Sequence, residues 1–129
     1  MNLYEILAII IAHWISDFVL QTHEQATKKS SSNYWLSQHI ATYTISMTIL
    51  IGTLVMFKMQ LREYHYIDFT LTSFIVITFI AHFITDYFTS RLNSYLWAKG
   101  DVHNFFVSVG FDQVLHYTQL FGTYYLLFL

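Results

Sequence analysis

The chain has 129 residues, of which 55% are hydrophobic and 11% are charged. Soluble domains carry about 25% charged residues, so this composition argues against water as the main solvent. The net charge of -2 and the lack of a basic cluster give no indication of nucleic-acid binding. The absence of cysteine excludes disulfides and thiolate metal ligands, and the absence of proline suits long unbroken helices.

Four apolar segments follow one another along the chain, at residues 3–20, 34–57, 66–88 and 102–129. A helix needs about 20 predominantly apolar residues to cross a bilayer. The sequence therefore predicts an all-α fold. We expect one domain over residues 1–129, an integral membrane four-helix bundle that crosses the bilayer four times.

Two other interpretations of these segments are less favoured. The first segment is not typical of a signal peptide, because it contains Glu5, His13 and Asp17 and has no Lys or Arg ahead of its apolar run. A soluble bundle would need a polar stripe on every helix. Residues 45–57 contain nothing more polar than Ser, Thr and Gly, so the second segment has no such stripe.

The connections between the segments predict an orientation. Positive side chains are more frequent in cytoplasmic loops. They are more numerous in the first and third connections (Lys28, Lys29, Arg91 and Lys99) than in the second (Lys58 and Arg62). We therefore expect a multi-pass protein of the inner (plasma) membrane, with the first and third connections in the cytoplasm and both termini outside.

Three aspartates lie inside the apolar segments, where each costs about 2.5–3.5 kcal/mol to insert at the centre of a span. Each has a histidine four residues away, which shares its face of a helix. These pairs are His13–Asp17, His82–Asp86 and Asp112–His116. His39 adds a fourth histidine from the second segment, and the up-down topology brings all seven residues to the same half of the bilayer. Such matched depth predicts a single site in the core of the bundle.

Four histidines and three aspartates form a nitrogen and oxygen donor set that suits a divalent ion, with Zn favoured and Mn or Fe as alternatives. Seven ligands exceed the needs of one tetrahedral ion. They would serve two ions that share a carboxylate, or one ion with supporting Asp–His pairs. We expect Asp17, Asp86 and Asp112 to include the catalytic carboxylates. The best candidates for substrate contacts are Lys29, Arg91, Gln21 and Gln113.

At these residues the sequence resembles a family of small bacterial and phage membrane proteins known as a domain of unknown function (the 3307 type). The matching stretches are 13–21 (HWISDFVLQ), Ala26 with Lys29, His39, 82–86 (HFITD) and 112–116 (DQVLH). The family often has a lysine three residues after the third-segment aspartate, where this chain has Thr89. It is also similar to inner-membrane proteins described as metal-dependent hydrolases, and this similarity implies a reaction class without a substrate.

These observations predict a membrane-embedded metal-dependent hydrolase that acts on a lipid-linked phosphate or ester near the cytoplasmic leaflet. Membrane lipids and a lipid-like substrate are the expected partners. A relay or transport protein for protons or a divalent metal would use the same residues as a pathway. A phage or defence effector that acts by oligomerising would not need the histidines at all. The pairs would also fit a purely structural role, in which each His–Asp contact satisfies two buried polar groups.

Overall fold

The computed structural model describes residues 1–59 and 67–128, and within them it contains helices and no strand. The elements in chain order are α1 (Leu3–Trp14), the π-helical turn η1 (Ile15–Val19), α2 (His23–Lys28), α3 (Asn33–Met59), α4 (Ile67–Ala98) and α5 (Val102–Phe128). The predicted all-α class is confirmed for this part of the chain. Tyr66, Leu129 and Arg62, which the predicted segments and orientation use, lie outside the described residues.

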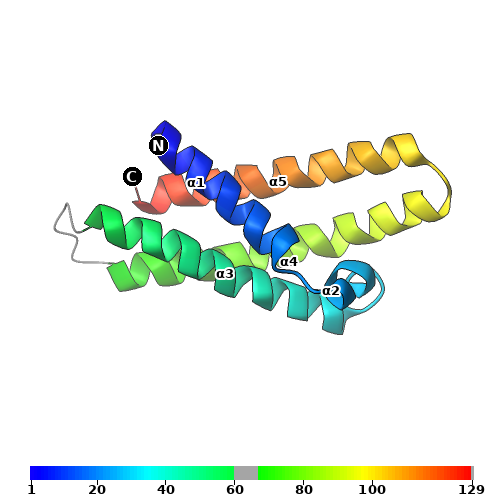
Figure 1. The fold of residues 1–129 in the computed structure, drawn as a ribbon, viewed down its shortest axis with the longest axis horizontal. Helices are drawn as coiled ribbons and strands as arrows, with labels where there is room; N and C mark the ends of the chain where they lie inside the picture. The colour runs from blue at the N-terminus through cyan, green and yellow to red at the C-terminus, as the bar shows by residue number, and fades with distance from the viewer. Residues whose placement is uncertain (60–66, 129) are drawn as a thin grey trace.

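Helices α3, α4 and α5 run along the length of the molecule, and α1 crosses them obliquely (Figure 1). Both termini lie at the end of the molecule where α3 finishes and α4 begins. Helix α2 and the turn between α4 and α5 lie toward the opposite end (Figure 1). This arrangement agrees with the up-down order of the predicted segments.

The structure differs from the predicted segments in two places. Helix α4 continues past Phe88 to Ala98, so Arg91 belongs to a helix and not to a connection. The first connection contains the short helix α2, which an apolarity pattern does not detect because its sequence HEQATK is polar. The turn after α4 is set by Gly100, whose φ of 73° is readily adopted only by glycine.

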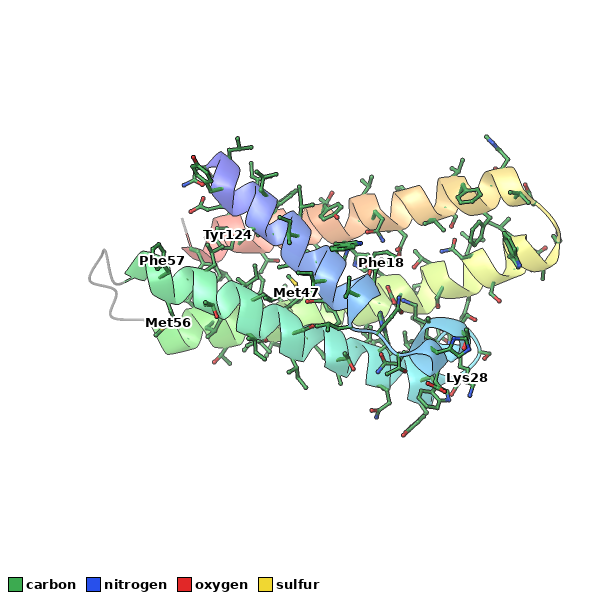
Figure 2. The ribbon with its side chains drawn as sticks, in the orientation of Figure 1. Phe18, Lys28, Met47, Met56, Phe57 and Tyr124 are labelled. Atoms are coloured by element: carbon green, nitrogen blue, oxygen red, sulfur yellow. The ribbon has the colours of Figure 1, made fainter. Side chains whose placement is uncertain are left out.

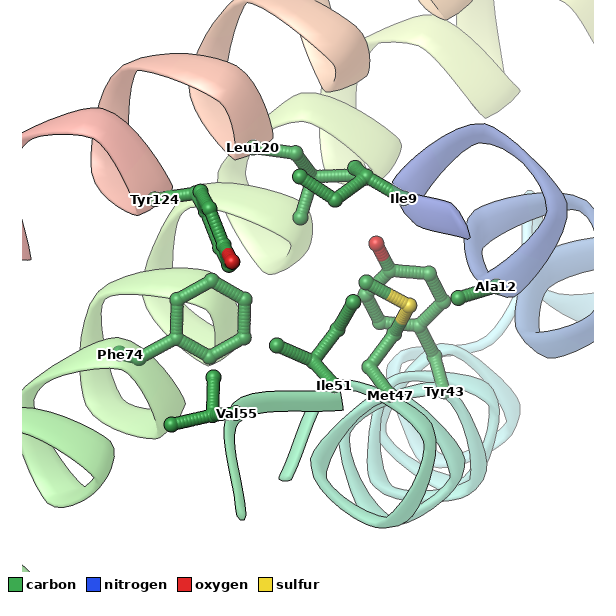
Figure 3. Close-up of a cluster of buried hydrophobic side chains, with 9 residues drawn as sticks. All are labelled: Ile9, Ala12, Tyr43, Met47, Ile51, Val55, Phe74, Leu120 and Tyr124. Carbon is green, nitrogen blue, oxygen red and sulfur yellow. The ribbon is translucent and has the colours of Figure 1, made fainter. Parts of the chain in front are cut away.

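An apolar core fills the half of the bundle nearest the termini (Figure 3). It takes side chains from α1, α3, α4 and α5, all of them at most 5% exposed: Ile9, Ala12, Tyr43, Met47, Ile51, Val55, Phe74, Leu120 and Tyr124. Tyr43 stands at one edge of this core and contacts the first histidine of the polar cluster described below. The core therefore closes one end of that cluster.

Large apolar side chains also cover the outside of the helices. Figure 2 shows Phe18, Met56 and Phe57 pointing away from the bundle, where they are 45%, 56% and 69% exposed. Two helical stretches among the described residues, Asn33–Phe57 and Phe69–Ala98, are long and apolar enough to cross a membrane. Length and composition thus identify two candidate spans in α3 and α4.

Candidate metal centre

The centre of the bundle is polar. Six side chains that are at most 3% exposed meet there from α1, η1, α3, α4 and α5: His13, Asp17, His39, His82, Asp86 and His116. Asp112 lies beside them with a side chain that is 13% exposed. The structure thus brings together all seven residues that the sequence predicts as metal ligands, although their individual roles stay predictions.

Four of these residues form a group of converging ligand atoms. One atom each of Asp17, His39, His82 and Asp86 lies within 4.8 Å of the others. His39 Nε2 is 3.0 Å from Asp17 Oδ1 and 3.2 Å from Asp86 Oδ2. His82 Nε2 is 3.4 Å from His39 Nε2 and 3.6 Å from Asp17 Oδ1. We call these four residues the first ligand group.

The spacing of the first ligand group fits a metal ion. Nitrogen and oxygen ligands of Zn²⁺ lie about 2.0–2.1 Å from the ion, so the corners of a tetrahedron around it are about 3.3–3.4 Å apart. The measured separations of 3.0–3.6 Å scatter around that value. Two nitrogen atoms and two carboxylates also form the donor set that borderline divalent ions prefer. These buried residues can therefore hold a metal ion.

Asp86 joins the first ligand group to a second one. His116 Nε2 is 3.1 Å from Asp86 Oδ1 and 3.3 Å from Asp112 Oδ1. The second group also has one ligand atom of each residue within 4.8 Å of the others, and it consists of Asp86, Asp112 and His116. Asp86 thus contacts His39 and His82 of the first ligand group and His116 of the second, as a carboxylate shared between two sites would.

Lys29 supplies a positive charge at the first ligand group. Its Nζ lies 2.8 Å from Asp86 Oδ2 and 3.1 Å from His39 Nε2. Burial lowers the pKa of Lys29, but the nearby Asp86 and Asp17 carboxylates more than offset this effect and hold the pKa above its usual value. The positive charge of the lysine therefore partly compensates the charge of the buried carboxylates.

His13 lies beside the first ligand group and takes part in a chain of hydrogen bonds. Gln113 Nε2 donates to Asp112 Oδ2 over 3.1 Å, which leaves its Oε1 to accept from His13 Nε2 at 3.2 Å. His13 Nδ1 then accepts from the Tyr43 hydroxyl at 3.1 Å. This arrangement puts the proton of the neutral imidazole on Nε2 and makes His13 a support for Gln113 and Asp112.

The local backbone explains how Asp17 reaches the cluster. Helix α1 widens into the π-helical turn η1, in which the Leu20 amide donates to the Ile15 carbonyl oxygen over 2.9 Å. Such turns are rare and frequently occur at functional sites. Asp17 lies within this turn and still keeps a 3.6 Å approach to His13 Nε2. The i,i+4 spacing predicted the pairing of these two residues but not the change in helix type.

Two of the predicted substrate contacts, Arg91 and Gln21, form no hydrogen bond to a ligand residue among the described residues. Arg91 donates from Nη2 to Asn33 Oδ1 over 2.7 Å and from Nη1 to the Tyr87 carbonyl oxygen over 2.8 Å, so it ties α4 to the start of α3. Gln21 is half-buried, and its Oε1 has no hydrogen-bond partner among the described residues. A role for either in substrate binding stays a prediction.

One contact of the site has no signal in the sequence. Thr89 Oγ1 donates to Asp112 Oδ1 over 2.6 Å and joins α4 to α5. The resemblance marked Thr89 only as a departure from a lysine. Together with Gln113, this hydroxyl gives Asp112 a hydrogen bond on each oxygen atom and fixes its orientation.

The fold and the site define an all-α protein with a buried histidine–aspartate cluster that can hold metal. The chain belongs to the family described as protein of unknown function (DUF3307), whose model matches residues 6–129. The predicted family resemblance is thereby confirmed over nearly the whole chain. No curated protein and no solved structure matches the chain.

Proposed function

We propose that this chain is a membrane-embedded metal-dependent hydrolase that acts on a lipid-linked phosphate or ester near the cytoplasmic leaflet of the plasma membrane. The observation that carries the proposal is the first ligand group, in which four buried residues each place one ligand atom within 4.8 Å of the others and four of the atom pairs lie 3.0–3.6 Å apart. Structural pairing alone explains individual His–Asp contacts. A metal ion would in addition account for two histidine nitrogens that lie 3.4 Å apart between carboxylates from two different helical elements.

A location in the membrane explains the distribution of polarity. Charged and imidazole side chains occupy the interior, whereas large apolar side chains on every long helix are at least 40% exposed, among them Ile11, Ile49, Phe79 and Val114. In water this pattern would leave extensive apolar surface uncovered. In a bilayer the same surface faces lipid, and ionisable residues face the bundle interior and mark function. We propose four spans, of which α3 and α4 are the longest apolar stretches.

The residues of the site have different roles. The first ligand group would hold a Zn²⁺, Mn²⁺ or Fe²⁺ ion through Asp17, His39, His82 and Asp86. When bound, such an ion lowers the pKa of its water ligand and polarises a carbonyl or phosphoryl oxygen. Asp112 is held by Thr89 and Gln113 and is more exposed than the other carboxylates, so it is the best-placed acceptor for a proton from water.

The proposed reaction is a hydrolysis. The water oxygen forms a new bond to phosphorus or to the acyl carbon, and the bond to the ester oxygen breaks. Asp112 Oδ1, which lies 3.3 Å from His116 Nε2, shares the abstracted proton with that imidazole. The departing ester oxygen then takes up the proton and leaves as an alcohol. Lys29 would contact the negative charge of the substrate.

The transport alternative requires a polar path to the other end of the bundle. The apolar core lies across that direction, with Ile51, Phe74 and Tyr124 at most 2% exposed. This arrangement favours a site that is entered and left from one end of the bundle. We therefore prefer a hydrolase to a channel.

Elemental analysis of the detergent-purified protein tests the metal on which the proposal depends. We expect at least one Zn, Mn or Fe per chain in the wild type and in His103→Gln, whose histidine is exposed. We expect a loss of at least tenfold in bound metal for His82→Gln. Asp112→Asn should keep the ion of the first ligand group but release no phosphate or alcohol from lipid phosphate esters. A wild-type protein without metal, even after incubation with each ion, would refute the proposal.

A further inference from the structure

An open groove of about 780 Å³ lies next to the ligand groups. It is bounded by residues of α2, of the second half of α4 and of the first half of α5. In Figure 1 these parts of α4 and α5 extend as a hairpin beside α2, at the end of the molecule away from the termini. Neither the family match nor the roles assigned above account for this groove.

The walls of the groove differ in character. One part carries hydroxyl and amide groups, including Ser90, Asn93 and Ser94, and the other is apolar and includes Trp97, Phe106 and Val109. Ser90 Oγ and Asn93 Oδ1 are buried and have no hydrogen-bond partner among the described residues. The groove therefore presents polar side chains and an apolar surface to one ligand.

Lys29 connects the groove to the first ligand group. It lines the groove, and its Nζ also lies 2.8 Å from Asp86 Oδ2. Among the described residues that line the groove, Lys29 is the one charged side chain, and none is a carboxylate. A negatively charged group in the groove would therefore meet an attractive charge at the point nearest the ligand groups, the Lys29 ammonium that also pairs with Asp86.

We propose that this groove binds an anionic amphiphile of the phosphatidate class, with its phosphate monoester at Lys29 and its acyl chain along the apolar wall. The inference rests on the proposed function, since it supplies the substrate class for that site. A phosphate monoester carries nearly two negative charges and three acceptor oxygens, which match an ammonium group surrounded by hydroxyl and amide donors. The apolar wall gives binding energy to an acyl chain that free phosphate lacks.

Native mass spectrometry of the detergent-purified protein, with chelator present, tests binding separately from metal and hydrolysis. The probes are dioctanoyl phosphatidate, dioctanoylglycerol and inorganic phosphate. We expect one phosphatidate per chain, and at least tenfold weaker binding of the other two probes. Equal binding of dioctanoylglycerol would overturn the role of the head group, and equal binding of phosphate would overturn the role of the acyl chain.

Two neighbouring lysines provide a matched control. Lys28 is exposed, lies over the Trp35 ring and points away from the bundle (Figure 2). Lys29→Gln should weaken phosphatidate binding at least tenfold, and Lys28→Gln should leave it unchanged. Equal effects of the two substitutions would overturn the proposal, because they would indicate general surface attraction.

A second variant covers the case in which Lys29→Gln does not fold. Val109→Trp narrows the groove without altering a ligand residue, and it should also weaken binding at least tenfold while the helical content stays unchanged. Unchanged binding by this variant would overturn the proposal. If the protein binds metal and hydrolyses lipid esters but not phosphatidate, the proposed function stands and the groove assignment fails. If the protein binds phosphatidate but elemental analysis finds no bound metal, the groove assignment stands and the proposed function fails.

Discussion

Among the individual residues of the site, Lys29 has the most direct effect on metal binding. Its ammonium group lies 2.8 Å from Asp86 Oδ2 and 3.1 Å from His39 Nε2, within the set of atoms that would bind a metal ion. Two cations that share partly buried ligands repel each other, and the repulsion is stronger there than in water. A metal ion that binds the first ligand group must therefore move Lys29 away from Asp86, toward the groove that it lines.

Replacing this lysine by a neutral side chain should make metal binding tighter. We expect Lys29→Met to lower the dissociation constant for Zn²⁺ about tenfold, which corresponds to about 1.4 kcal/mol. Lys28→Met, which changes the neighbouring exposed lysine, should leave the constant unchanged. Competition with a chromophoric chelator measures both values. Weaker binding by Lys29→Met would show that the lysine belongs to the metal-bound arrangement.

At the residue scale, the sequence located the cluster but not its connections. The i,i+4 spacing and the matched depth were sufficient to bring His13, His82 and His116 together with their aspartates. These patterns do not reveal that Lys29 would reach Asp86, since the residues lie 57 positions apart and meet only because α2 folds back on α3.

At the scale of elements, α2 determines where Lys29 lies. Thr22 caps this helix in a capping box with Gln25. The Gln25 side chain also donates to Thr42 Oγ1 of α3 over 2.9 Å, and Gln25 is only 5% exposed. An isolated helix of six residues is not stable in water, so tertiary contacts of this kind must hold α2 in place.

Loss of the Gln25 side chain should release α2 from the bundle. Gln25→Ala removes both the capping-box contact and the bond to Thr42, and we expect a cost of about 1–3 kcal/mol for that local structure. Hydrogen exchange followed by mass spectrometry should show faster exchange over residues 22–32 and unchanged exchange in α5. His23→Ala alters an exposed residue of the same helix and should exchange like the wild type. Slow exchange in Gln25→Ala would mean that other contacts hold α2.

Comparison of the predicted segments with the helices shows which helix ends the apolar runs of the sequence predict correctly. The starts of α3 and α5 fall within one residue of the predicted ones, because polar or charged residues precede both helices. The end of α4 was placed too early, since its last turns carry Ser90, Arg91 and Asn93 and lack an apolar run. A helix can extend through polar residues when it packs beside another helix. Here α5 runs alongside the last turns of α4 (Figure 1).

At the scale of the whole molecule, the positions of the N-terminus and of α2 distinguish two membrane topologies. Helix α1 has 12 residues and η1 adds 5, so this element is shorter than the 27 residues of α3. If α1 and η1 cross the bilayer, the N-terminus and α2 lie on opposite sides. If only α3 and α4 cross, the N-terminus and α2 lie on the same side. Figure 1 shows the N-terminus and α2 toward opposite ends of the molecule, as the proposed four-span topology requires.

Single cysteines can decide between these topologies, since the chain has no native cysteine. Three exposed residues suit this test: Tyr4 in the first turn of α1, Ser31 between α2 and α3, and His103 at the start of α5. With four spans and the predicted orientation, a membrane-impermeant maleimide should label Tyr4→Cys in intact spheroplasts. It should label Ser31→Cys and His103→Cys only after lysis, because both lie on the side rich in Lys and Arg. Equal labelling of Tyr4→Cys and Ser31→Cys in intact spheroplasts would refute the four-span topology, and protection of Tyr4→Cys alone would reverse the orientation.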